Sequence, residues 1–104
     1  MRRGTTPTIT FTVDNVDLTT LTALYVTFKQ SGVWSVTKKS GDDGVTVEAH
    51  KITVKLTQQE TLKFRAGGTV MVGFRGRTVG GDAIASEPKA LDGKVGDVLY
   101  DGVI

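Results

Sequence analysis

The chain has 104 residues, a formal net charge of +2 and no cysteine. This length predicts one domain spanning residues 1–104, and the lack of cysteine excludes disulfides, zinc–thiolate sites and cysteine nucleophiles. The small net charge argues against a nucleic-acid partner, and the lack of a long apolar run argues against a membrane partner.

Two residue types dominate the composition, with 16 threonines and 14 valines beside 13 glycines and only 2 prolines. Both are branched at Cβ, which restricts χ1 in a helix and suits the pleated surface of a sheet. Frequent glycine supplies tight turns between short strands. The composition therefore predicts an all-β protein.

Strict alternation of apolar and polar residues marks the first strands. Residues 8–13 place Ile9 and Phe11 on one face and threonines on the other. Residues 24–30 alternate in the same way, and Ser31 and Gly32 join them to residues 33–38 as a hairpin. The intervening stretch from residue 17 is expected to be a loop or one helical turn. Residues 45–48 and 52–56 are the next strand pair.

A helix start follows the fifth strand. Thr57 and Glu60 have the spacing of a capping box, in which each side chain bonds the other residue's backbone N–H. We expect one short helical turn near residues 58–64, ended at Gly67 and Gly68.

The second half of the chain contains two more strand candidates. Residues 69–79 form the longest one and place Arg75 and Arg77 on the same face. Gly73 and Gly76 interrupt it, which indicates a bulge or a close backbone neighbour. Residues 83–89 are expected to return as a further strand, whereas residues 91–104 show no clear period.

About seven strands with turns every 8–12 residues predict an antiparallel β-sandwich of the immunoglobulin type. Trp34, on the third strand, occupies a position where such domains often keep a core tryptophan. Without a disulfide, packing around Trp34 is expected to hold the two sheets together.

The sequence offers poor material for catalysis or ligation. His50 is the only histidine and falls in a short turn. The acidic turn at residues 41–44 lacks the alternating ligands of a calcium loop, and the glycine pairs are not followed by the Lys-Ser/Thr of a phosphate loop. We therefore expect no catalytic residue, no metal site, no cofactor and no enzymatic activity.

Interaction residues are the remaining candidates. Arg75 and Arg77 could form a basic patch for an acidic partner, although a solvated sheet face is the simpler interpretation. The other candidates lie in the N-terminal arm and the C-terminal segment, and strand edges could serve as docking sites. The candidate interaction residues are Arg2, Arg3, Arg75, Arg77, Tyr100, Val103 and Ile104.

Three segments resemble a known family: residues 1–8 (MRRGTTPT), 54–64 (VKLTQQETLKF) and 96–104 (GDVLYDGVI). They are similar to small proteins encoded in the tail and head gene clusters of phages and prophages of Gram-positive bacteria. The strand–turn pattern also resembles the immunoglobulin-like domain at the start of phage baseplate upper proteins.

This resemblance implies a non-enzymatic structural or assembly protein of the tail or baseplate region. Its partners would be other virion proteins or further copies of itself. It would be located in the virion and assembled in the host bacterial cytoplasm. The alternative is a carbohydrate- or cell-surface-binding module that uses Tyr25, Trp34 or Tyr100 as a stacking platform.

Overall fold

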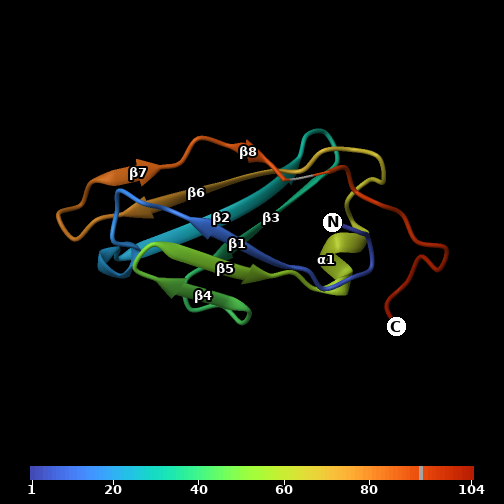
Figure 1. Ribbon diagram of the computed structural model, residues 1–104, viewed down its shortest axis with the longest axis horizontal. Helices are drawn as coiled ribbons and strands as arrows, with labels where there is room; N and C mark the ends of the chain where they lie inside the picture. The colour runs from blue at the N-terminus through green and yellow to red at the C-terminus, as the bar shows by residue number, and fades with distance from the viewer. Residues whose placement is uncertain (92) are drawn as a thin grey trace.

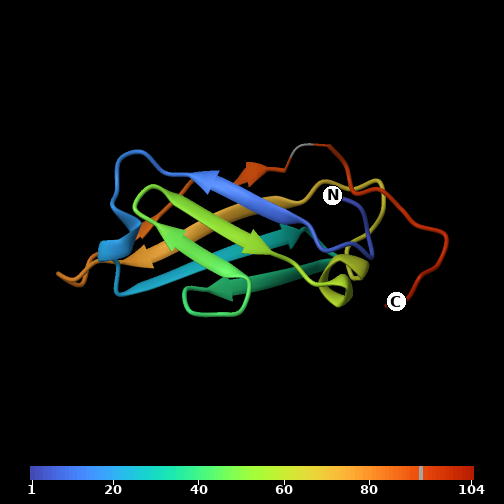
Figure 2. The same ribbon diagram turned by 60° about the horizontal axis from the view of Figure 1, so that its bottom comes forward.

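The computed structural model describes residues 1–91 and 93–104, which form two antiparallel β-sheets (Figure 1). One sheet has the strand order β1 (Thr8–Thr12), β5 (Lys51–Lys55) and β4 (Val45–Glu48). The other has the order β3 (Trp34–Lys39), β2 (Ala23–Gln30), β6 (Met71–Arg77) and β7 (Ala83–Ala85), and β8 (Lys89–Ala90) also pairs with β6. The prediction of a mostly β protein with sandwich-like layers is confirmed (Figure 2).

The core lies between the two sheets and follows the predicted alternation. On β2, Leu24, Val26 and Phe28 are buried, whereas Tyr25 and Lys29 are exposed. The rings of Phe28 and Phe11 connect the sheets with centroids 6.1 Å apart. The buried apolar side chains are Leu18, Leu24, Val26, Phe28, Ile52, Val54, Leu56, Phe64, Val70, Val72 and Val95.

Trp34 is not the centre of this core, so that expectation was wrong. It is the first residue of β3, an edge strand, and its side chain is only half-buried. Its ring packs in an edge-on manner against Phe64, with centroids 5.3 Å apart, and the Lys63 ammonium lies 4.9 Å from the ring centroid. The tryptophan therefore closes one end of the molecule, and aliphatic residues with Phe28 hold the sheets together.

The capping box at Thr57 and Glu60 is confirmed. The Glu60 N–H donates to the Thr57 hydroxyl at 3.2 Å, and the Thr57 N–H donates to the Glu60 carboxylate at 2.8 Å. The helix α1 (Gln58–Leu62) ends before residue 64, because Lys63 and Phe64 bond carbonyls only three residues back. The stretch after residue 17, for which a loop or one helical turn was expected, contains one 3-10 turn, η1 (Leu18–Thr20).

The longest strand is β2, with eight residues, and not the stretch that contains β6, with seven. The pairing of β2 with β6 runs without a bulge from Ala23 opposite Arg77 to Lys29 opposite Met71. Gly76 instead marks a close neighbour, since a Cβ there would lie 2.8 Å from Leu21 Cδ1. The expected return strand is divided into β7 and β8, because the intervening Pro88 has no N–H for the ladder.

Candidate functional site

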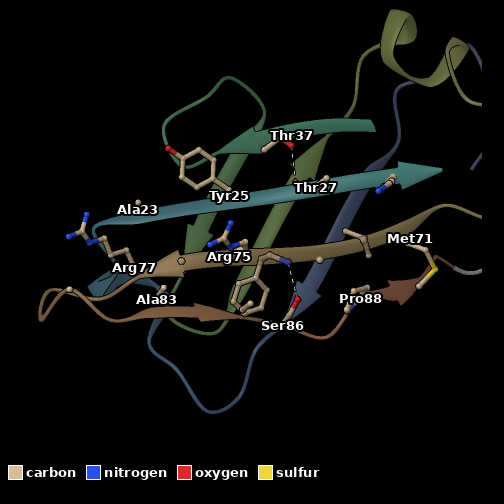
Figure 3. A pocket seen from close by; sticks show the side chains of 17 residues that line it. Ala23, Tyr25, Thr27, Thr37, Met71, Arg75, Arg77, Ala83, Ser86 and Pro88 are labelled. Atoms are coloured by element: carbon tan, nitrogen blue, oxygen red, sulfur yellow. Dashed lines mark hydrogen bonds between the residues drawn. The ribbon is translucent and has the colours of Figure 1, made fainter. Parts of the chain in front are cut away.

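The outer surface of the larger sheet carries a basic face, which we define as Tyr25, Lys29, Lys39, Arg75 and Arg77. The strand register places Tyr25 opposite Lys39 on one side and opposite Arg75 on the other. Directly opposed side chains on neighbouring strands have Cβ atoms about 5 Å apart, so these three lie in one row across the sheet. The two predicted arginines thus share their face with an aromatic ring (Figure 3).

The basic face is hollowed because small residues surround its large side chains. Arg77 lies between Ala23 and Ala83, and Gly73 lies beside Thr27 on the far side of the Tyr25–Arg75 row. The resulting open concavity has a volume of about 1020 Å³. Its floor is fixed by the Thr27–Thr37 hydroxyl pair at 2.8 Å (Figure 3). An open hollow bordered by cationic side chains is suited to a protruding group of a partner.

The electrostatics of the basic face are one-sided. No aspartate or glutamate lines the concavity in the part of the chain that the structure describes. Over residues 1–91 and 93–104, none of the four cations of the face takes part in an ion pair. Arg75 and Arg77, two residues apart on a strand, lie roughly 7 Å apart at the backbone. The face is therefore ready to receive an anionic group.

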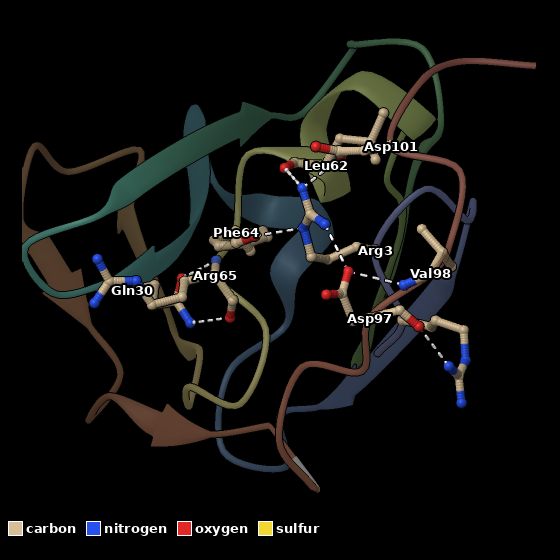
Figure 4. Close-up of polar contacts among 9 residues, drawn as sticks. Arg3, Gln30, Leu62, Phe64, Arg65, Asp97, Val98 and Asp101 are labelled. Atoms are coloured by element: carbon tan, nitrogen blue, oxygen red, sulfur yellow. Dashed lines mark hydrogen bonds and ion pairs between the residues drawn. The ribbon is translucent and has the colours of Figure 1, made fainter.

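Arg3 is held inside the molecule, as Figure 4 shows. Its guanidinium donates to the carbonyls of Leu62 at 2.8 Å and Phe64 at 2.9 Å, just after α1. It also forms ion pairs with Asp97 and Asp101, both at 2.7 Å. The hydrogen bond from Arg3 holds the pKa of the Asp97 carboxyl below its ordinary value. Arg3 is thus used to join the N-terminal arm, the helix end and the C-terminal segment.

The N-terminal arm and the C-terminal segment form a terminal staple, defined as residues 1–3 and 95–97. Arg2 and Gly96 make a parallel bridge. The Gly96 N–H donates to the Met1 carbonyl at 2.8 Å, and the Arg3 N–H donates to the Gly96 carbonyl at 2.9 Å. The Arg2 side chain donates to the Asp97 carbonyl at 2.6 Å but stays exposed.

The predicted C-terminal interaction residues lie apart from the basic face. Tyr100, Val103 and Ile104 are exposed by 68%, 51% and 93%. The Ile104 backbone is nevertheless bound to α1, since its N–H donates to the Gln58 side chain at 2.8 Å. The structure therefore brings Arg75 and Arg77 together on one face, and of the terminal candidates it places Arg3 and Ile104 against α1.

Sequence reasoning missed Gln30, which is only 5% exposed. Its side-chain amide donates to the Arg65 carbonyl at 2.9 Å and accepts from the Arg65 N–H at 2.6 Å (Figure 4). A Cβ on Gly68 would overlap the same amide. The sequence did contain a signal for its burial: every second residue of β2 faces the core, and Gln30 follows Val26 and Phe28 in that series.

His50 has a structural contact in the turn between β4 and β5. Its Nδ1 lies 3.0 Å from the carbonyls of both Val13 and Val16. Both partners are acceptors, so Nδ1 carries the proton and the ring anchors the segment after β1. Within residues 1–91 and 93–104, no group of three His, Cys, Asp or Glu side chains is placed to hold a metal ion.

The comparisons with known proteins give no match: no family model, no curated protein and no solved structure is similar to the chain. In the part of the chain that is described, no helix has the length and apolar character needed to cross a membrane.

Proposed function

We propose that this chain is a non-enzymatic binding module that holds an acidic surface of a partner protein on its basic face. The observation that carries the proposal is the row Lys39–Tyr25–Arg75 beside a concavity that no acidic residue lines among residues 1–91 and 93–104. Tyrosine and arginine are enriched in protein interfaces because they combine large contact area with directed hydrogen bonds. Unpaired cations on one face also attract an anionic partner over several ångströms before contact.

We further propose that the partner is a virion protein and that the module is a structural or assembly component of a phage tail or baseplate. The support is the resemblance of the segments at residues 1–8, 54–64 and 96–104 to proteins of phage structural gene clusters. The extensive use of strands and a shallow basic face are compatible with an assembly role.

The strand order supports an immunoglobulin-like topology as the finer description of the fold. The orders β1-β5-β4 and β3-β2-β6-β7 correspond to B-E-D and C′-C-F-G of that family. In this correspondence the basic face is the outer surface of the C′-C-F-G sheet. Trp34 then lies on C′ and not on C, which agrees with its half-buried position.

The test is co-sedimentation of the protein with phage particles from the host that carries its gene. The wild-type protein is expected in the particle fraction, and the double variant Arg75→Glu/Arg77→Glu is expected to be lost from it. The matched control is Lys51→Glu/Lys55→Glu, which changes the net charge equally but lies on exposed positions of β5 in the other sheet. Absence of the wild-type protein from particles contradicts the virion role. Retention of the Arg75→Glu/Arg77→Glu variant in the particle fraction contradicts the role of the basic face in binding.

A second candidate function is binding of an acidic carbohydrate. Tyr25 favours it, because this residue is 47% exposed and has a cation opposite it on each neighbouring strand. Trp34 is a poor platform, since Lys63 lies over its ring and Phe64 packs at its edge. A glycan array distinguishes the two: specific hits that disappear with Tyr25→Ala favour the carbohydrate module, and an array without hits removes it.

A further inference from the structure

The two sheets present four edges, and three of them carry devices that prevent pairing with another chain. Lysines occupy the end of β3, Glu48 ends the four-residue β4, and β7 and β8 are very short and separated by a segment containing Pro88. Charges, proline and shortness are the usual protections of an edge strand. By contrast, β1 has five residues, TITFT, without a charge or a proline.

The free side of β1 is defined by its register with β5. The bonds from Val13 N–H to the His50 carbonyl and from Leu56 N–H to the Pro7 carbonyl fix the odd-numbered residues as those bonded to β5. The backbone groups of Thr8, Thr10 and Thr12 therefore point away from the sheet. In the described part of the chain, these three residues make no backbone hydrogen bond outside the ladder with β5.

We propose that β1 pairs antiparallel with β1 of a second copy, about a two-fold axis at Thr10. Thr10 then faces Thr10 of the partner subunit, and Thr8 faces Thr12 of the partner subunit. Each pair exchanges both of its backbone hydrogen bonds, and the two three-stranded sheets become one continuous sheet. Opposed threonines on the outer face add favourable cross-strand contacts. The contact is isologous, so it closes at a dimer and does not propagate.

Three features of the surface favour a second copy as the occupant. The strand is self-complementary, since reversal of TITFT again places threonine opposite threonine. Ile9 and Phe11 are only half-buried. Pairing places Ile9 of one copy opposite Phe11 of the other, so the contact covers part of their remaining apolar surface.

The third feature is charge. Lys55 lies opposite Thr8 and Lys51 opposite Thr12 on the neighbouring strand. In the dimer the lysines of the two copies are separated by three strand spacings, about 14 Å. This exceeds the screening length of about 8 Å at physiological ionic strength, so their repulsion is weak.

The first test is sedimentation equilibrium of the full chain from about 10 µM to about 1 mM, a range suited to a small interface. Wild type is expected to shift from the monomer mass of 11.1 kDa to twice that value. Thr10→Lys, which sets two ammonium groups directly opposite each other, is expected to raise the dissociation constant at least tenfold. The control Thr46→Lys makes the same exchange on the same sheet face at the opposite edge, β4, and is expected to dimerise as wild type does.

The second test reads the strand directly by amide hydrogen exchange in NMR. The amides of Thr8, Thr10 and Thr12 are expected to gain protection with concentration, whereas those of Ile9 and Phe11 are protected already by β5. The proposal is overturned if the chain stays monomeric over the whole concentration range, or if Thr46→Lys weakens dimerisation as much as Thr10→Lys does. It is also overturned if the exchange rate of the Thr10 amide does not change with concentration. This edge lies on the other sheet from the basic face, so Thr10→Lys leaves binding through Arg75 and Arg77 unchanged and the two proposals fail separately.

Discussion

Replacement of Gln30 by leucine tests how the segment after α1 is held to the sheet. Gln30 is buried at the end of β2 and makes two hydrogen bonds with the backbone of Arg65, which is 35 residues away. Leucine keeps most of the volume but has neither donor nor acceptor. The partly buried Arg65 N–H then loses the one partner that the described contacts give it, whereas the Arg65 carbonyl keeps the Gly68 N–H at 3.4 Å.

The magnitude follows from the cost of an unpaired polar group. Each buried donor or acceptor left without a partner costs about 1–3 kcal/mol. The added apolar surface of leucine returns roughly 1–2 kcal/mol. With about 1 kcal/mol more for the bond lost at the carbonyl, we expect Gln30→Leu to lower the free energy of unfolding by about 1–2 kcal/mol, out of the roughly 5–15 kcal/mol typical of a domain.

The assay is urea unfolding followed by fluorescence of Trp34, which lies opposite Gln30 in the register. Gln58 provides a matched control, because its side-chain amide contacts the Ile104 backbone in the same two-bond manner on the exposed surface. Gln58→Leu is expected to change stability by less than about 0.5 kcal/mol. Equal effects of the two substitutions, or a Gln30→Leu protein as stable as wild type, would refute the reasoning.

Two further predictions concern α1 and β6. Burial alone raises the pKa of Glu60, but its ion pair with Lys38 at 2.6 Å and the Thr57 N–H outweigh burial and hold the pKa below its ordinary value. Because the folded state favours the carboxylate, this contribution is complete above the ordinary glutamate pKa and is lost as the pH falls through the lowered one. Melting temperatures measured against pH should therefore fall more steeply in acid for wild type than for Glu60→Gln, and parallel curves would contradict this. Gly76→Ala should cost about 1–3 kcal/mol, because its Cβ would lie 2.8 Å from Leu21 Cδ1 and 3.3 Å from the Ala23 carbonyl; an unchanged urea midpoint would count against it.

Local patterns predicted the elements of this fold well. Alternation on β1 and β2 identified the inward residues, and the four-residue motif at Thr57 and Glu60 identified the start of α1. In both cases the signal lies within a few residues, where backbone geometry fixes which side chains share a face. The same argument placed Arg75 and Arg77 on one surface.

Long-range partners were beyond the reach of sequence reasoning. Arg3 was expected to be available to a partner protein, yet its guanidinium contacts residues 59 to 98 positions away. Trp34 was expected in the core because of its place on the third strand of the chain, but that strand lies at an edge of its sheet. Periodicity gives the direction of a side chain and not the strand order, which decides what that side chain meets. Pro88 was a visible signal that the return strand is interrupted, and it was overlooked.

The terminal staple has a mechanical consequence. Residues 1–3 and 95–97 run parallel, and both chain ends emerge near α1 (Figure 1). A force that pulls the ends apart therefore acts along the two segments in opposite directions. It loads the Gly96–Met1 and Arg3–Gly96 hydrogen bonds together, as shear, and not one after the other. Once the hydrogen bonds between Ile104 and Gln58 are lost, tension applied through the termini is borne by this short bridge and the Arg3 ion pairs, while both sheets remain unloaded until the staple yields.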